Sequence, residues 1–417
     1  MNILVVHQFY LRPGQPGGPR FNELARFWRE DGHDVHVVAS SVSYTAGTRP
    51  RTRWPWSSGR EVDIDVVRTW AAEHRRGVLW RRAASMLGYA GLGTLAATLR
   101  GPRPDVVIAS SPTLAALVPG LFAASRWQCP LIVEVRDLWP ESLVSLNIVD
   151  PDAVVTRATY GFEEAAYELA DCVVALTPGI RDRLVRRGVV EPDRVAVIPN
   201  GVDLESLRVP TREEARRRLG WGSEFVAVYA GAHGVANGLD QLIDAAELLR
   251  AEDVRLLAVG DGPERAALRS QTNDRGLLNL RWLDSIPREE LFTVFAAADA
   301  GIVCLRGAET FRTVYPNKMF DYMAAALPVV LGVEGVAAAL VLKSRAGLCF
   351  TPEHPGELAR ALLRLKEHPP ERRAMGRRGH DLVQRRFDRK KQAQEYLAVM
   401  RDVAGHPHGP SPGSMRP

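Results

Sequence analysis

Short apolar runs alternate with amphipathic segments along the chain, and their order predicts the fold. The first run, residues 2–6 (NILVV), leads into a loop rich in glycine and proline, and the segment from Phe21 to Trp28 then carries apolar side chains at helical spacing. Gly32 ends this predicted helix, and residues 34–40 (DVHVVAS) form the next predicted strand. Strand, glycine loop, helix and strand in this order predict the start of a doubly wound α/β domain.

The same pattern recurs through the first half of the chain and begins again in the second. In the first half, further strands are predicted within residues 104–110, 129–137, 171–188 and 193–203. In the second half, strands are predicted within residues 224–234, 254–265, 279–287 and 300–306, with helices within residues 238–251 and 288–299. The chain is therefore expected to hold two consecutive Rossmann-like halves, with a break near residues 203–215.

Two uncharged stretches raise the question of membrane-spanning helices. Residues 83–99 are diluted by Gly, Ser and Thr, and residues 106–125 are interrupted by two prolines. A spanning helix needs about 20 strongly apolar residues, so both stretches are predicted to be buried strand and helix. The N-terminus shows neither the basic region nor the cleavage site of a signal peptide, and residues 404–417 have the composition of a disordered tail.

Composition and charge narrow the class of protein without fixing a partner. The 417 residues, 46% of them hydrophobic, suffice for two domains with separate cores. The net charge of +5 fits a solvated, arginine-rich surface as well as contact with an anionic partner. The four cysteines lie far apart without zinc-site spacing, which indicates core thiols in a reducing compartment. The arginines are dispersed and no nucleic-acid recognition motif occurs, so nucleic-acid binding is not expected.

Three glycine loops directly follow predicted strands. They contain Gly17 with Gly18, Gly231, and Gly260 with Gly262. Glycine lets backbone N–H groups approach a phosphate at the positive end of a helix, and parallel sheets bind ligands at the carboxyl ends of their strands. Each loop alone is equally typical of an ordinary turn. Three of them at strand ends together predict a phosphate-binding site in a cleft between two domains.

A fourth strand end carries residues 313–330 (TVYPNKMFDYMAAALPVV). Lys318 is the first lysine of the chain, since every earlier basic side chain apart from histidine is an arginine. Asn317 is predicted to cap a helix whose first turn holds Lys318 and Asp321. There Lys318 can meet an anion at the positive helix end, and Asp321 can accept hydrogen bonds from ribose hydroxyls. The alternative is a surface lysine beside an acid that complements the helix dipole.

Four motifs together resemble a known enzyme family. PNGVD at residues 199–203, GDGPE at 260–264 and PNKMFDYMAAALPVV at 316–330 are similar to the retaining glycosyltransferases of family four, which have the GT-B fold. RDLWPES at residues 136–142 resembles the branch that builds capsule, colanic-acid and O-antigen polysaccharides, including fucosamine-type transferases. The resemblance covers about residues 1–400.

The resemblance implies a domain organisation and a reaction. Residues 1–205 would form an N-terminal Rossmann-like acceptor domain, and residues 206–384 a C-terminal Rossmann-like domain for the nucleotide-sugar donor. The last helix, around residues 385–402, would fold back on the first domain. The implied reaction transfers a sugar, with an amino sugar favoured, from a UDP-linked donor with retention at the anomeric carbon. GT-B enzymes generally work without a metal, so no metal site and no other cofactor are expected.

The resemblance also assigns roles at the donor site. Asp321 matches the acid that binds the donor ribose. Thr313 stands where the family has the acid that contacts the transferred sugar, and Glu309 is nearby but off register. The sugar contact is therefore expected from Thr313 or from backbone groups.

In this chain, the positive charge for the donor phosphates is expected from a different position than in the family. Ala232 and Asn237 stand where the family often has an arginine and a lysine for the pyrophosphate. Lys318 is therefore expected to bind the phosphates, with Asn237 at the edge of the site and Arg20 as a further cation. A compact point charge on a flexible stem suits this role better than a planar guanidinium.

Arg136 and Asp137 follow the predicted strand at residues 131–135, where the family commonly has a histidine-bearing loop near the reacting sugar. Asp137 can orient or deprotonate an acceptor hydroxyl, or act as a structural cap. Together with Lys318 these two residues are the expected catalytic groups. His7, at the end of the first strand, is either a further cleft residue or a structural histidine. No carboxylate nucleophile is evident, which favours front-face attack guided by the departing phosphate.

The acceptor is expected to be a glycan, a small molecule or a polyprenyl-diphosphate-linked sugar, because branch members often act at the inner membrane face. Residues 74–92 carry four arginines around Trp80, Met86 and Leu87. Basic and aromatic residues that flank an apolar helix suit contact with an anionic membrane, although an ordinary surface helix has the same pattern. The protein is therefore expected to be cytoplasmic, and peripheral contact with the inner membrane face is one of these two alternatives.

Two rival functions share this fold. A UDP-N-acetylhexosamine 2-epimerase would turn over the donor without an acceptor, but the carboxylates on which those enzymes rely have no evident counterpart here. A catalytically inactive homologue would bind the nucleotide without turnover, and the uncharged residues at positions 232, 237 and 313 favour this alternative.

Overall fold

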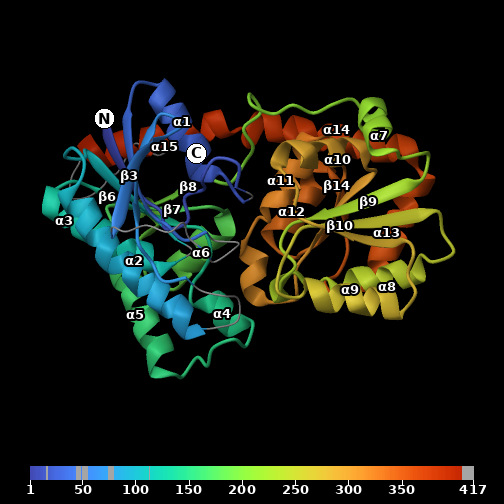
Figure 1. Ribbon diagram of the computed structural model, residues 1–417, viewed down its shortest axis with the longest axis horizontal. Helices are drawn as coiled ribbons and strands as arrows, with labels where there is room; N and C mark the ends of the chain where they lie inside the picture. Colours follow the sequence, from blue (N-terminus) through green and yellow to red (C-terminus); the bar gives the residue numbers. More distant parts are fainter. Residues whose placement is uncertain (16, 44–47, 49–54, 74–78, 112, 406–417) are drawn as a thin grey trace. The chain divides into compact units, whose positions relative to one another are not determined.

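The computed structural model describes residues 1–405 apart from 16, 44–47, 49–54, 74–78 and 112 (Figure 1). The chain forms two compact units, one made of Met1–Pro199 with the chain from Lys390 onward, the other of Asn200–Arg389. It passes between the units near residues 199 and 389, whereas the sequence placed the breaks near residues 205 and 384. Each unit is a Rossmann-like α/β domain on a mainly parallel sheet, which confirms the predicted fold class.

The first unit is built on an eight-stranded sheet with the order β3-β4-β2-β1-β5-β6-β7-β8. Its strands are β1 (Asn2–Val6), β2 (Asp34–Ser40), β3 (Trp56–Glu61), β4 (Ile64–Thr69), β5 (Val106–Ser110), β6 (Leu131–Val135), β7 (Cys172–Ala175) and β8 (Val195–Val197). All neighbours pair in parallel except β3 and β4. The sequence did not predict β3, because this edge strand is polar, largely exposed and without alternating apolar residues.

The helices of this unit connect the parallel strands. They are α1 (Arg20–Glu30), α2 (Leu79–Leu99), α3 (Leu117–Trp127), α4 (Glu141–Ser145), α5 (Val154–Glu168) and α6 (Pro178–Arg186), with short 3₁₀ turns η1 (Leu114–Ala116) and η2 (Pro192–Arg194). Among the described residues, no helix combines the length and the apolar content that crossing a membrane requires.

The last helix, α15 (Arg389–Gly405), packs into the core of the first unit. Tyr396 and Leu397 are buried in the same cluster as apolar side chains of β1 and β2. The Trp28 indole of α1 donates a hydrogen bond to the carbonyl oxygen of Ala393 over 3.0 Å, and its ring meets Tyr396 edge to face at 5.4 Å. Burial of these large rings fixes the C-terminal helix on the N-terminal sheet. The predicted tail contributes only its first two residues to α15, and residues 406–417 lie outside the described residues.

The second unit is built on a six-stranded parallel sheet with the order β11-β10-β9-β12-β13-β14. Its strands are β9 (Phe225–Ala230), β10 (Val254–Val259), β11 (Leu280–Leu283), β12 (Ala300–Cys304), β13 (Val329–Gly332) and β14 (Gly347–Cys349). The strand order reverses between β9 and β12. In open parallel sheets, ligands bind beyond the carboxyl ends of the strands at such a switch point.

Helices cover both faces of this second sheet (Figure 1). One face carries α8 (Asp240–Leu248), α9 (Arg265–Asp274) and α13 (Pro355–Glu367). The other carries α10 (Arg288–Ala297), α11 (Asn317–Ala324), α12 (Val336–Ser344) and α14 (Pro369–Arg386). The remaining elements are α7 (Arg212–Leu219) and the 3₁₀ turns η3 (Val235–Asn237) and η4 (Glu309–Thr313).

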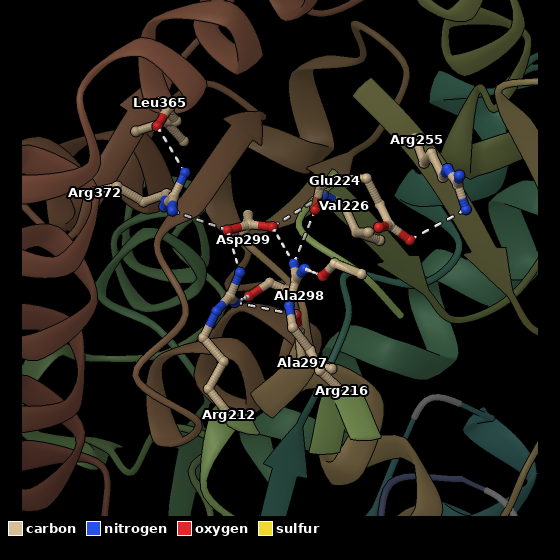
Figure 2. A network of polar contacts seen from close by, with 11 residues as sticks. Arg212, Arg216, Glu224, Val226, Arg255, Ala297, Ala298, Asp299, Leu365 and Arg372 are labelled. Carbon is tan, nitrogen blue, oxygen red and sulfur yellow. Dashed lines mark hydrogen bonds and ion pairs between the residues drawn. The ribbon is translucent and has the colours of Figure 1, made fainter. Parts of the chain in front are cut away.

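A buried carboxylate joins the elements at the amino ends of β9 and β12. Figure 2 shows three arginines that converge on Asp299: Arg212 and Arg216 of α7, at 2.6 and 2.8 Å, and Arg372 of α14, at 3.0 Å. The Val226 N–H of β9 donates to the same carboxylate over 3.0 Å. The side chain of Asp299 is only 2% exposed, so its charge is compensated almost entirely by these partners.

Replacing this carboxylate should destabilise the second unit. Asp299→Asn keeps the shape of the side chain but removes the charge that the arginines share, and loss of one partner of a buried ion pair costs about 3 kcal/mol. Urea unfolding followed by circular dichroism should show this loss, whereas Asp253→Asn, at an exposed aspartate, should leave the unfolding free energy unchanged. Equal stability of the two variants would contradict the structural role of Asp299.

Candidate functional site

The glycine loops after β9 and β10 touch through their backbones. A Cβ atom on Gly260 would lie 1.9 Å from the carbonyl oxygen of Gly231, and one on Gly262 would lie 2.1 Å from that of His233. The Gly231 N–H donates to the Val259 carbonyl oxygen over 2.9 Å, which continues the pairing of the two strands into the loops. Three of the predicted donor-binding glycines are thus brought together at the carboxyl ends of β9 and β10, beside the switch point of the sheet.

Gly17 and Gly18 belong to the first unit, where they precede α1. Gly17 has a φ of +151°, a conformation that side-chain-bearing residues rarely adopt. A Cβ atom at this position would lie 2.9 Å from the Leu11 side chain. This glycine is therefore required by the loop itself, and its role toward a ligand stays a prediction.

Helix α11 begins differently from the prediction. Asn317 is its first residue, the preceding Pro316 takes the N-cap position with extended backbone, and no side chain caps the helix. The predicted cap at Asn317 was therefore wrong by one residue, because proline already sets the backbone angle at which the helix starts. Asp321 is the fifth residue of α11 and lies in its second turn, so the prediction that it shares the first turn with Lys318 was also wrong.

Lys318 reaches the glycine loop as a cation without a carboxylate partner. Its Nζ atom lies 3.4 Å from Asn237 Oδ1 and 3.7 Å from the ring centroid of Tyr229. Among the described residues it forms no ion pair. Removal from water lowers the pKa of this ammonium to about 8. The missing side chain of Gly231 makes room for it, because a Cβ there would lie 3.0 Å from Nζ.

Asp321 has a partner that the sequence analysis missed. The Arg288 guanidinium, at the start of α10, donates to both carboxylate oxygens of Asp321 over 2.7 and 3.5 Å. Arg288 also lies over the Phe292 ring, 5.2 Å from its centroid. This two-pronged contact fixes the orientation of the carboxylate. The two residues are 33 positions apart, and only the packing of α10 beside α11 brings them together.

Thr313 and Glu309 both lie on the short turn η4. The Thr313 hydroxyl donates to the Thr310 carbonyl oxygen over 2.7 Å. The Glu309 side chain is 74% exposed and pairs with Arg312 at 3.2 Å. Thr313 is therefore held within its own turn, while Glu309 lies in solvent.

A second group of predicted residues lies in the first unit, at the carboxyl ends of β1 and β6. Arg136 Nη1 lies 3.4 Å from His7 Nε2, and the Arg136 backbone N–H donates to Ser111 Oγ over 2.9 Å. Burial and the nearby guanidinium lower the pKa of His7 to about 3, so its imidazole is neutral near pH 7. Asp137 is exposed beside this pair.

Arg20 does not fit the role of a phosphate-binding cation. Its guanidinium is 1% exposed and pairs with Glu134 at 2.9 Å in the core of the first unit. Its other N–H groups donate to the carbonyl oxygens of Ile198 and Pro199 over 3.0 and 2.6 Å. The expectation that Arg20 helps at the phosphates was therefore wrong, because its donors already join α1, β6 and the segment after β8.

In the part of the chain that the structure describes, no three His, Cys, Asp or Glu side chains lie close enough together to hold a metal ion.

Comparison with known proteins identifies the family. Residues 17–201 match the family model described as a glycosyl transferase 4-like domain, and residues 224–368 match that of the glycosyl transferases group 1. A D-inositol 3-phosphate glycosyltransferase from Catenulispora acidiphila is 30% identical over 289 residues, which cover 66% of this chain and 67% of that protein. The probable glycosyltransferase WbjE from Pseudomonas aeruginosa is 24% identical over 68% of this chain and 72% of its own. Other relatives are matched over 60 to 63% of their length.

Solved structures with the same fold support the assignment. Sucrose-phosphate synthase from Thermosynechococcus elongatus aligns with a TM-score of 0.76 and 18% identity over 97% of this chain and 99% of its own. Anabaena HepE in complex with UDP-glucose aligns with a TM-score of 0.70 and 21% identity over 96% of this chain and 99% of its own. These structures show the GT-B fold. With both halves of the chain matched in order, the protein belongs to the group 1 glycosyltransferases and is a glycosyltransferase.

Proposed function

We propose that the protein transfers a sugar from a UDP-linked donor and that Lys318 binds the donor diphosphate. The observation that carries this proposal is the Lys318 ammonium itself, which is partly buried, forms no ion pair with any residue that the structure describes and lies at the switch point of the second sheet. An ammonium in this state gains most from an anionic ligand. Solved relatives of the same fold hold UDP or UDP-glucose, which supports uridine as the base.

The position of Lys318 also accounts for the uncharged residues of the glycine loop. The family resemblance places a lysine at position 237, where this chain has asparagine. Lys318 Nζ lies beside the Asn237 side chain, so α11 supplies the positive charge to the place that residue 237 would otherwise serve. In this proposal, a cation on α11 takes the place of the cation that the resemblance expects in the glycine loop. The phosphates therefore still have a positively charged partner, which argues against an inactive homologue.

Asp321 is proposed to bind the ribose. A carboxylate oriented by Arg288 can still accept hydrogen bonds from the sugar hydroxyls, since each oxygen has a second lone pair. The 2.7 Å bond engages Oδ1 more closely than the 3.5 Å contact engages Oδ2, which leaves Oδ2 the better acceptor for a ligand.

The reaction is proposed to retain the anomeric configuration without a metal. The acceptor oxygen forms a bond to the anomeric carbon as the bond to the phosphate oxygen breaks, and the hydroxyl proton passes to the departing phosphate. Lys318 stabilises the charge on the leaving diphosphate. The N–H groups of Gly231, Gly260 and Gly262 already donate within the fold, to the Val259 and Leu283 carbonyl oxygens and to Asp261 Oδ1, so they are not available to the phosphates. In the first unit, Arg136 and Asp137 are proposed to position the acceptor, since the pair lies at a strand end and Asp137 is an exposed residue.

The acceptor is proposed to be a glycan or lipid-linked sugar of a bacterial envelope polysaccharide. The motif at residues 136–142 and the similarity to WbjE support this class, with an amino sugar as the transferred group. The D-inositol 3-phosphate glycosyltransferases among the relatives favour a phosphorylated polyol as a second candidate acceptor. A panel of donors and both acceptor classes, assayed with and without EDTA, separates these alternatives and tests metal independence.

Contact with an anionic membrane at the cytoplasmic face is proposed for α2. Leu87, Leu95 and Leu99 are exposed by 74%, 46% and 68%, and their spacing places them along one side of the helix. Residues 79–104 contain arginines and no acidic side chain. An apolar stripe flanked only by cations fits a negatively charged lipid surface. Residues 74–78 of the predicted contact lie outside the described residues.

Removal of the Lys318 charge should weaken nucleotide binding. Lys318→Met keeps the length of the side chain but removes the ammonium, and loss of charge-assisted hydrogen bonds should weaken UDP binding by about 10- to 100-fold and lower kcat. Isothermal titration calorimetry and donor turnover measure both effects. Lys343→Met, at an exposed lysine of the same unit, is the matched control. Unchanged UDP affinity in a folded Lys318→Met variant would refute the assigned role.

UDP binding should also depend on pH through Lys318. The ammonium form binds the diphosphate, so affinity should be constant below the pKa of about 8 and fall toward tenfold per pH unit above it. The neighbouring His233 has its pKa lowered to about 4 and Cys304 has its pKa raised to about 12, so neither changes charge in this range. Calorimetry between about pH 7 and pH 10 tests this. A flat profile, or the same profile in Lys318→Met, would contradict it.

The proposed membrane contact should be lost when acids replace the exposed leucines. Leu87→Glu/Leu95→Glu removes apolar burial and adds negative charge, so binding to vesicles that contain phosphatidylglycerol should fall by about tenfold or more. Leu278→Glu, at a 92% exposed leucine of the second unit, should bind like the wild type. Sedimentation with anionic and neutral vesicles measures the difference. Wild-type binding that is absent, or indifferent to anionic lipid, would remove the proposal.

A further inference from the structure

We propose that Tyr229 is a positioning residue for the donor diphosphate, because its ring face holds the Lys318 ammonium while leaving that charge free for the ligand. The inference rests on the proposed role of Lys318 as the cation of the donor site. Tyr229 is the fifth residue of β9. The sequence analysis assigned it no role, because it lies within an apolar strand.

The geometry of the pair is that of a cation–π contact. Lys318 Nζ lies 3.7 Å from the centroid of the Tyr229 ring, well inside the distance at which ring and cation attract. The ring is wholly buried. Its hydroxyl donates to the Ala232 carbonyl oxygen over 2.7 Å, which ties the ring to the glycine loop. Tyr229 therefore joins the lysine and the loop in one arrangement.

The chemistry of the ring explains why no carboxylate is present. Lys318 is partly buried, and a partly buried ammonium needs compensation for the water it has lost. A carboxylate would supply it but would also cancel the positive charge and repel a diphosphate. An aromatic face stabilises the cation without net charge and occupies none of its three N–H donors. With one donor directed to Asn237, the remaining donors of Lys318 stay available to phosphate oxygens.

Gly231 lies close to the ammonium as well as to the ring. A Cβ at residue 231 would lie 3.0 Å from Lys318 Nζ and 3.5 Å from the Tyr229 hydroxyl oxygen. The backbone here is left-handed, with a φ of +145°, so a side chain is disfavoured by conformation as well as by space. The ring of Tyr229 thus holds the lysine, and Gly231 leaves room for it. Any side chain at residue 231 would crowd the ammonium.

The neighbouring groups do not provide another counter-charge. Cys304 of β12 is fully buried, and burial raises the pKa of its thiol to about 12, which keeps it neutral. The Tyr322 hydroxyl of α11 accepts from the Ala230 N–H over 2.8 Å and donates to the Ile302 carbonyl oxygen over 3.2 Å. Both groups are therefore uncharged partners of the strands, and the Tyr229 ring is the surface on which the cation rests.

The experiment measures the affinity for UDP by calorimetry in a double-mutant cycle. Tyr229→Leu should weaken UDP binding by about 10- to 30-fold, since a desolvated cation–π contact is lost. Tyr229→Phe, which keeps the ring, should restore binding to within about threefold of the wild type. In the Lys318→Met background, Tyr229→Leu should change the affinity by less than about threefold, because the cation is already absent.

A matched control separates this effect from loss of core packing. Phe350 belongs to the same buried cluster as Tyr229, and Phe350→Leu removes an aromatic ring from it without touching Lys318. This variant should lose stability but keep its UDP affinity. If Tyr229→Leu weakens UDP binding equally with and without Lys318, the role of Tyr229 is structural and the proposal is overturned.

A second measurement avoids the risk that Tyr229→Leu fails to fold. Starting from Tyr229→Phe, the ring can carry one, two or three fluorines. Each fluorine weakens the attraction of the ring for a cation at nearly constant size. The logarithm of the UDP dissociation constant should rise steadily with fluorination. A flat series, with UDP binding still lost in Lys318→Met, overturns the role of Tyr229 and leaves the proposed function standing. Absence of UDP binding in the wild type overturns both.

Discussion

The close approach of two backbones, at the carboxyl ends of β9 and β10, is the constraint on which the candidate donor site depends. Gly260 and Gly262 have no room for a side chain, because the carbonyl oxygens of the β9 loop occupy the positions that a Cβ would need. The parallel pairing of the strands extends into the loops through the hydrogen bond from Gly231 to Val259. The two loops therefore meet through their backbones at the switch point of the sheet, which is where open parallel sheets bind ligands.

The charged side chains at the two ends of the second sheet differ in their partners. At the amino ends of β9 and β12, Asp299 is surrounded by three arginines and its charge is neutralised within the fold. At the carboxyl ends, Lys318 is partly buried and its ammonium lies against the neutral ring of Tyr229, with no ion pair to any described residue. Compensated buried charge specifies structure, whereas uncompensated buried charge costs stability unless a ligand completes it. This contrast distinguishes the candidate site from the structural network without reference to any relative.

The sequence predicted what depends on local pattern and missed what depends on contacts between distant residues. Most strands along the chain, the glycine loops and the exceptional lysine follow from periodicity and residue type, whereas β4, β13 and β14 were not predicted. The polar edge strand β3 carries no such signal. Arg288 and Asp321 meet only because α10 packs beside α11, and Tyr229 meets Lys318 across 89 positions of sequence. The cap of α11 was misplaced because a proline and an asparagine in succession offer two possible starts for a helix.

In the proposed donor site, Lys318 of α11 supplies the positive charge that the family resemblance expects at position 237. An arginine in its place would bring a planar guanidinium against a loop where even one added carbon at Gly231 would lie 3.0 Å from the ammonium. The compact ammonium lies 3.7 Å from the centroid of the Tyr229 ring and 3.4 Å from Asn237 Oδ1. The proposed donor site needs one positive charge at the switch point that no carboxylate among the described residues neutralises. The space that the backbone leaves open beside Gly231 determines which cationic side chain can provide this charge.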